Sequence, residues 1–131
     1  MTRVLLIDDD RNLREVVGFM LEEAGYAVET AGDAGTGLAR LAERGADLVL
    51  TDMKMPGRDG MDVLREVQPT GTPVIVLTAH GTVPQAVQAM QLGAASYLLK
   101  PFERAELLIA VERALADRAL RRDNARLRDL L

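Results

Sequence analysis

The sequence predicts an α/β protein in which an open parallel sheet is covered by helices on both faces. Five short apolar runs alternate with five amphipathic segments along the 131 residues. Several runs are apolar at every position, which is typical of strands buried on both faces. Glycine follows three of the amphipathic segments, where helices commonly end. Because parallel neighbours need crossover connections, this alternation places helices on both sides of one sheet.

The predicted strands are short, and most of them run directly into a polar residue. The first strand reads Val-Leu-Leu-Ile and is followed by three consecutive aspartates. The second strand is the weakest, because it lacks a continuous apolar run. The predicted strands span residues 4–7, 27–30, 48–50, 73–77 and 96–99.

The predicted helices carry apolar side chains at helical spacing. In the first helix, we expect one buried face made by Leu13, Val16, Val17, Met20 and Leu21. The fourth helix has Pro84 in its first turn, where the missing N–H leaves no hydrogen bond unmade. The helices span residues 12–24, 34–43, 61–67 and 83–92, with a last helix from about residue 103 that can reach the C-terminus.

The composition excludes several kinds of site. Apolar residues make up 48% of the chain and aromatic residues only 3%, so the core is expected to be aliphatic. There is no cysteine, which excludes disulfides, thiol catalysis and cysteine-bound zinc. The single histidine, His80, excludes a site with several histidine ligands. A carboxylate site for a hard metal ion remains open.

The charge pattern bears on partners and location. The net charge of −4 disfavours direct binding of nucleic acid by these residues, since such domains usually present a basic surface. No apolar run approaches the roughly 20 residues needed to span a bilayer. The N-terminus lacks the layout of a signal peptide. We therefore expect a cytoplasmic protein without membrane association.

Polar residues stand at the ends of four predicted strands. These residues are Asp8, Asp9 and Asp10 after the first strand, Asp52 after the third, Thr78 after the fourth and Lys100 after the fifth. The carboxyl ends of parallel strands meet at one edge of the sheet, where ligands bind. We therefore expect these side chains to converge on one site, except Asp10, which is expected to cap the following helix.

This set of groups indicates phosphoryl chemistry at a metal site. Crowded carboxylates repel one another, and a hard divalent cation such as Mg²⁺ relieves that repulsion. An aspartate can accept a phosphoryl group, while a lysine and a threonine hydroxyl can bind its oxygens.

The motifs at these positions resemble the receiver domains of two-component signalling, over residues 3 to about 116. The motifs are Leu6-Ile-Asp-Asp-Asp10, Thr51-Asp-Met-Lys-Met-Pro-Gly57 with Gly60, Thr78-Ala79, and Tyr97-Leu-Leu-Lys-Pro-Phe102. The resemblance implies a flavodoxin-like (CheY-like), doubly wound sheet of order 2-1-3-4-5, here with an extended C-terminal helix. It also implies that Asp52 accepts a phosphoryl group from a sensor histidine kinase and that Mg²⁺ is the cofactor.

The resemblance further assigns a role to each site residue. Asp9 and Asp52 would bind Mg²⁺ with the backbone carbonyl of Lys54, and Asp8 would act mostly through a bound water. Lys100 would pair with a phosphoryl oxygen.

A second set of implied roles concerns the response to phosphorylation. Thr78 would bond to the phosphoryl group and move with it. Tyr97 would then turn inward and reshape the surface of the fourth helix, fifth strand and fifth helix. Lys54, Ala79 and His80 would flank the phosphoryl group. The bond between Lys100 and Pro101 is expected to be cis.

A narrower resemblance concerns the segment His80-Gly-Thr-Val-Pro-Gln-Ala-Val-Gln-Ala-Met90 with Gly93-Ala94, which is similar to receivers of the nitrogen-regulator type. Those receivers precede an AAA+ ATPase that drives sigma-54 RNA polymerase. The chain has no Walker motif, so output ATPase and DNA-binding domains are expected on a longer protein. We divide the chain into a receiver domain, residues 1–116, and a helical linker, residues 117–131.

The linker carries a short coiled-coil pattern. Leu120, Asn124, Leu127 and Leu131 follow 4-3-4 spacing, with a polar residue of the kind that can fix register. We expect a homodimer through this helix, to which the fourth helix and fifth strand can contribute.

Three alternatives remain open beside a non-enzymatic phosphorylation switch. A small Mg²⁺-dependent phosphohydrolase would turn over phosphoesters steadily, but no insertion for a substrate-binding cap is visible. A flavin-binding protein would be yellow, and the acidic first loop would repel its phosphate. A degenerate receiver would lack one of the site residues, and none is missing.

Overall fold

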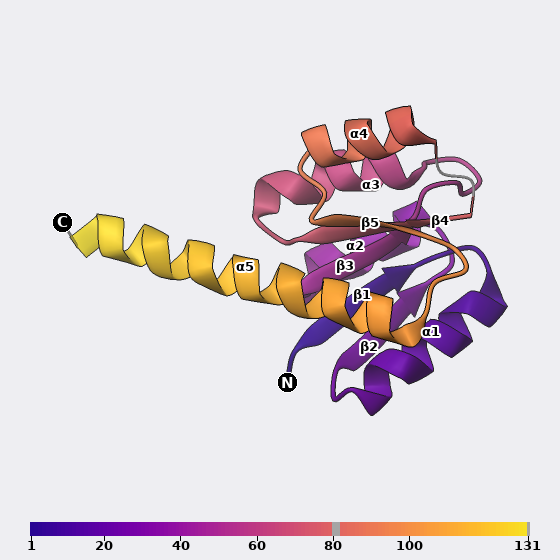
Figure 1. Cartoon of the computed structure of the whole chain (residues 1–131), viewed down its shortest axis with the longest axis horizontal. Helices are drawn as coiled ribbons and strands as arrows, with labels where there is room; N and C mark the ends of the chain where they lie inside the picture. Colours follow the sequence, from indigo (N-terminus) through magenta and orange to yellow (C-terminus); the bar gives the residue numbers. More distant parts are fainter. Residues whose placement is uncertain (80–81, 131) are drawn as a thin grey trace.

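The computed structural model describes residues 1–79 and 82–130, with the side chains of residues 121–130 left undescribed. Its sheet has five parallel strands in the order β2-β1-β3-β4-β5, which confirms the predicted class and order. The strands are β1 (Arg3–Ile7), β2 (Ala27–Ala31), β3 (Leu48–Asp52), β4 (Val74–Thr78) and β5 (Ser96–Leu99). Figure 1 shows the sheet between two layers of helices.

The helices follow the predicted positions to within a few residues. They are α1 (Arg11–Glu23), α2 (Ala34–Arg44), α3 (Gly60–Val67), α4 (Val83–Gln91) and α5 (Arg104–Leu130). A short 3₁₀ turn, η1 (Gln68–Thr70), follows α3 and was not predicted. Pro69 lies within it, where a proline ring fits the first turn of a helix.

Alternate residues of each strand bury against opposite helical layers. Val4 and Leu6 pack with α1 and α5, whereas Leu5 and Ile7 pack with α2, α3 and α4. Every residue of β3 is buried, as expected for a strand covered on both faces. The buried core of the described chain is almost entirely aliphatic, as the composition predicted.

The buried face of α1 is narrower than predicted. Val17 and Leu21 are buried against the sheet, and Leu13 and Met20 are partly buried. The prediction was wrong for Val16, which is 54% exposed. A helix on a flat sheet buries only the stripe directly over the strands, and Val16 lies on its far flank.

The last helix extends beyond the domain. Its first half packs on the sheet through Leu107, Ala110, Val111 and Ala114. Its 27 residues span about 40 Å at ~1.5 Å per residue, and Figure 1 shows the C-terminal half projecting away from the sheet. The predicted boundary after residue 116 falls within this helix. None of the helices in residues 1–79 and 82–130 is both long and apolar enough to cross a membrane.

Candidate functional site

The carboxyl edge of the sheet brings the predicted site residues together. Ile7 of β1 pairs with Thr51 of β3, so the residues that follow them, Asp8 and Asp52, are neighbours. Lys100 follows β5 and Thr78 ends β4, at the same edge. The sheet therefore delivers two acids, a hydroxyl and a cation from four strands.

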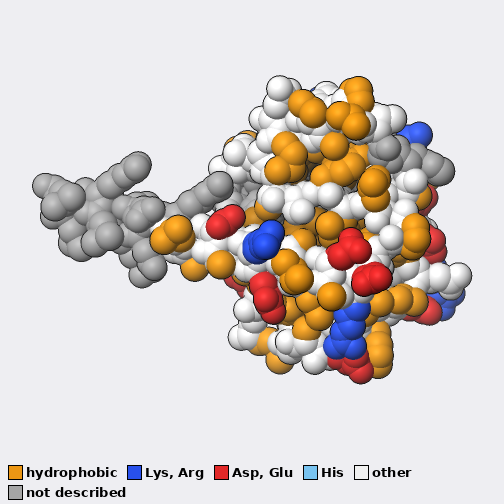
Figure 2. All heavy atoms as spheres, in the orientation of Figure 1, with side chains coloured by type: hydrophobic (Ala, Val, Ile, Leu, Met, Phe, Trp, Pro, Cys, Tyr) orange, Lys and Arg blue, Asp and Glu red, His pale blue; other side chains and the backbone are white. Residues whose placement is uncertain are grey.

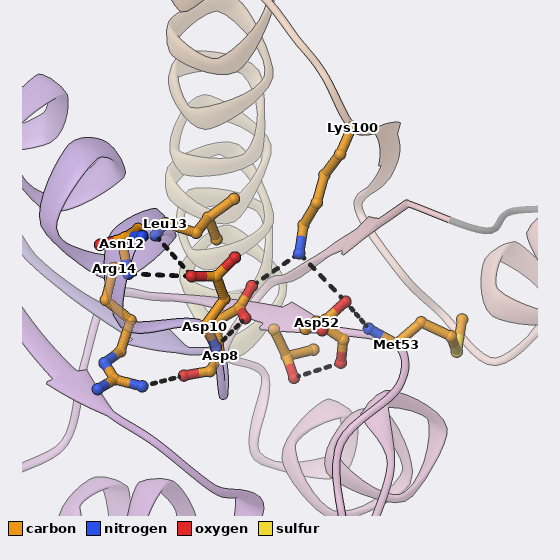
Figure 3. Close-up of polar contacts among 9 residues, drawn as sticks. Asp8, Asp10, Asn12, Leu13, Arg14, Asp52, Met53 and Lys100 are labelled. Atoms are coloured by element: carbon orange, nitrogen blue, oxygen red, sulfur yellow. Dashed lines mark hydrogen bonds and ion pairs between the residues drawn. The ribbon is translucent and has the colours of Figure 1, made fainter.

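Lys100 bridges the two buried acids. Its ammonium Nζ lies 2.9 Å from Asp8 Oδ2 and 3.4 Å from Asp52 Oδ1. Figure 3 shows the lysine side chain reaching down between the two carboxylates. Asp8 is fully buried, and Asp52 is nearly so. The backbone N–H of Met53 also donates to Asp52 Oδ1, at 2.8 Å.

Burial and neighbouring charges shift the pKa values of Asp52 and Lys100. Burial raises the pKa of Asp52 above its ordinary value, and the neighbouring Asp8 charge raises it further. Lys100 and the Met53 N–H only partly offset this rise. For Lys100, burial alone would lower the pKa, but the bond to Asp8 and the two carboxylate charges leave it raised. The lysine is therefore held in its charged form.

Three acids can share one cation. Asp8, Asp9 and Asp52 each offer a carboxylate oxygen, and these oxygens lie within 4.8 Å of one another. Asp9 is exposed at the mouth of the site. Three negative charges face the single ammonium of Lys100, so the excess is negative. Oxygen donors with excess negative charge fit a hard divalent cation such as Mg²⁺.

Asp8 is fixed on all sides. The backbone N–H of Asp10 donates to its Oδ1 at 2.9 Å, while Oδ2 accepts from Lys100. Arg14 of α1 donates to the Asp8 carbonyl at 2.6 Å. Asp10 caps α1 by accepting from the N–H groups of Asn12 and Leu13, which confirms its predicted role as a cap.

Two supporting residues had no predicted role. The buried Thr51 hydroxyl donates to the Asp52 carbonyl at 3.0 Å. Gly60 donates its N–H to the Met53 carbonyl at 2.8 Å, and a Cβ on it would lie 2.4 Å from the Asp52 carbonyl oxygen. The presence of glycine at position 60 was visible in the sequence, but its tight contact with Asp52 depends on how the loop folds back.

Thr78 ends β4, at the edge of the sheet where the acids lie, and Tyr97 lies on the neighbouring strand β5. Thr78 is buried, and its carbonyl accepts from the Lys100 N–H at 2.7 Å. The Tyr97 hydroxyl is also buried and makes no hydrogen bond of normal geometry to the described residues. Burial raises the pKa of Tyr97, and the nearby Thr78 hydroxyl partly offsets this. The tyrosine thus points inward, toward Thr78.

Two further predicted residues directly follow parts of the site in the chain. Lys54 and Ala79 are exposed. His80, predicted to flank the phosphoryl group, lies outside the described residues. The bond between Lys100 and Pro101 is cis, as the sequence resemblance implied.

The fold and the site define a receiver domain. Residues 4–112 match the family described as response regulator receiver domain. The chain therefore belongs to this family and is the receiver domain of a two-component response regulator.

Its relatives are transcriptional regulators. The chain is 45% identical over 129 residues to the C4-dicarboxylate transport transcriptional regulatory protein DctD of Pseudomonas aeruginosa, covering 97% of the chain and 28% of that protein. It is 42% identical over 118 residues to the transcriptional regulatory protein GlrR of Escherichia coli, covering 88% and 27%. A crystal structure of NtrX from Brucella abortus superposes with a TM-score of 0.91 at 33% identity, over 98% of this chain and 30% of that one.

These relatives confirm the predicted resemblance to receivers of the nitrogen-regulator type. The chain spans little more than a quarter of the two curated regulators.

Gly60 has no room for a side chain. Replacing it with alanine should lower the free energy of unfolding by about 1–3 kcal/mol, because the new methyl group meets backbone atoms of Asp52 and Met53. Urea denaturation measures this change. Gly35→Ala is the control, since its Cβ would meet only ordinary contacts in α2. A Gly60→Ala protein as stable as the Gly35→Ala protein would contradict the prediction.

Proposed function

We propose that the chain is a phosphorylation switch in which Asp52 accepts a phosphoryl group from the phosphohistidine of a sensor kinase. The observation that carries this proposal is the Lys100 ammonium between Asp8 and Asp52, inside a cluster of three acids. A carboxylate that must accept an anionic group needs compensating positive charge close by. The Lys100 ammonium is one such charge, and the cluster of three acids offers a binding site for a cation that would be the second.

Mg²⁺ fits as the second positive charge. Asp9 and Asp52 would hold it with the backbone carbonyl of Lys54, whereas Asp8 would act through a bound water. The engagement of both Asp8 oxygens by Asp10 and Lys100 supports this indirect role. When bound, the ion would neutralise the carboxylates and the incoming phosphoryl oxygens.

The transfer itself needs little from the protein beyond positioning. A carboxylate oxygen of Asp52 forms a bond to phosphorus as the bond between phosphorus and the kinase histidine nitrogen breaks. The imidazole leaves with its electron pair. Lys100 pairs with one phosphoryl oxygen, and the Thr78 hydroxyl donates to another.

The proposed output surface is formed by α4, β5 and α5. Val83, Val87, Met90, Leu99 and Ile109 are large apolar side chains on these elements and are about half exposed or more. Figure 2 shows hydrophobic side chains gathered over α4. Movement of Thr78 and Tyr97 beneath this surface would change how it binds a second copy or an output domain. The expected output is an AAA+ ATPase with a DNA-binding domain that activates sigma-54 RNA polymerase.

Phosphorylation of Asp52 is the direct test. Incubation with acetyl phosphate and Mg²⁺ should add the mass of one phosphoryl group, measured on the intact protein. Asp52→Asn should gain none, and neither should the wild type with a chelator. Asp33→Asn, which keeps a side chain that can cap α2 and lies outside the cluster of three acids, should gain mass normally.

Two outcomes would contradict the proposed switch. One is a wild-type protein that gains no mass and binds no beryllofluoride. The other is steady turnover of p-nitrophenyl phosphate, which would identify a phosphohydrolase instead.

Lys100→Ala separates metal binding from the phosphoryl response. The variant should bind Mg²⁺ at least as tightly as the wild type by calorimetry, because a competing positive charge is removed. Phosphoprotein should accumulate roughly 10- to 100-fold more slowly, since a charge-assisted hydrogen bond contributes about 1.5–3 kcal/mol. Arg113→Ala, an exposed cation on α5, is the control. Wild-type accumulation in Lys100→Ala would remove Lys100 from the mechanism.

We also propose a homodimer through the C-terminal half of α5. Leu120 is 61% exposed, and the rest of the predicted seam, Asn124, Leu127 and Leu131, lies outside the described side chains. Light scattering should give twice the chain mass at high concentration, and a chain ending at residue 119 should be monomeric. A monomer at every concentration would contradict the dimer.

A further inference from the structure

One ion pair joins the last helix to the amino end of β3, on the side of the sheet away from the three acids. Arg118 of α5 donates through Nη1 to the Asp47 carbonyl at 2.9 Å and lies 3.1 Å from Asp47 Oδ1. Asp47 directly precedes β3 and is held in turn by β1. Its Oδ2 accepts from the Arg3 N–H, and its own N–H donates to the Arg3 carbonyl, both at 2.8 Å. The acceptor is therefore fixed to two central strands.

Arg118 stands where α5 leaves the domain. The last fully buried side chain of the helix is Ala114, Leu115 packs partly buried against the same core, and Asp117, Ala119 and Leu120 are exposed. The Arg118 side chain is only 20% exposed and lies between two surface hollows, one beside α4 and one beside α2. Among the described side chains, it is the last that is not exposed. Beyond it the helix continues to Leu130.

We propose that Arg118 and Asp47 form a latch that sets the direction in which the C-terminal half of α5 projects from the receiver. The first half of the helix packs on the sheet, in part through the small side chains of Ala110 and Ala114. Because these side chains make few contacts, they leave the helix some freedom to tilt. A bond near the exit point removes that freedom. Two acceptors on one residue also fix the arginine more tightly than a single surface ion pair would.

A small change of angle at Arg118 moves the end of the helix by a larger distance. The 12 residues after Arg118 span about 18 Å at ~1.5 Å per residue, so a tilt of ~10° at Arg118 moves the helix end by ~3 Å. That displacement is enough to change how two such helices meet. The importance of the direction for output rests on the proposed function, whereas the latch itself does not depend on phosphorylation.

The test measures the direction of the helix. The chain has no cysteine, so Glu43→Cys on α2 and Arg126→Cys on α5 accept spin labels at two defined positions. Electron–electron double resonance then gives the distribution of distances between them. An excess of unlabelled protein keeps labels on different molecules apart. Arg118→Ala should shift or broaden the distribution by about 3 Å or more at the helix end, whereas Asp47→Asn, which keeps both oxygen acceptors and loses only the charge, should have a smaller effect.

Controls separate the latch from other effects. Arg113→Ala removes an exposed arginine from the same helix and should leave the distribution unchanged. Helical content by circular dichroism should stay constant, because the helix reorients without unwinding. The latch variants should still gain phosphoryl mass at Asp52, so a failure of the switch is seen independently.

Two results would overturn the latch. The first is a wild-type distribution in Arg118→Ala. The second is broadening that appears only together with loss of helical signal.

Discussion

The mutual repulsion of Asp8, Asp9 and Asp52, relieved in part by one ammonium, is the constraint on which this structure depends. Asp52 would ordinarily lose its proton easily, yet burial and the Asp8 charge raise its pKa. Lys100 offsets part of this cost because it lies within 3.4 Å of both buried acids. A site balanced in this way responds strongly to any added charge, which is the property that a phosphorylation switch needs.

The fold must hold these charges together against their repulsion, and it does so with backbone contacts. Asp8 follows β1 and Asp52 ends the adjacent, paired strand β3, so they cannot separate without breaking the centre of the sheet. The loop after β3 is held by Gly60, whose lack of a side chain lets it contact the Asp52 carbonyl. The acids are therefore positioned by buried, paired strands, and Lys100 and Thr78 lie at the ends of the neighbouring strands β5 and β4.

From two local signals, periodicity and strand-end position, the sequence predicted a parallel sheet, the convergence of the acids with Lys100 and the capping role of Asp10, and the strand order followed from its resemblance to receiver domains. It did not predict the exposure of Val16, since the width of a buried face depends on what packs against it. The contact of Gly60 depends on how the loop after β3 folds back, and the bond of the Thr51 hydroxyl depends on its rotamer within β3. The contact of Arg118 with Asp47 joins residues 71 positions apart. Such pairings follow from the assembled fold, and no local pattern marks them.

Polar contacts hold the last helix and the segment before it to the domain at three points. Lys100 precedes it and contacts the acids, Arg104 pairs with Glu23 of α1 at 2.7 Å, and Arg118 contacts Asp47. Asp47 and Asp52 lie at opposite ends of one short, buried strand, so β3 links the acceptor edge to the exit point of the helix. The segment before α5 contacts one end of β3 through Lys100, and α5 itself contacts the other end through Arg118. Because a buried strand is stiff, these two contacts lie at a fixed separation. If the proposed phosphorylation of Asp52 draws Lys100 toward it, the pull would act on a helix held by these ion pairs, and the response we expect is a tilt of the helix rather than its detachment from the domain.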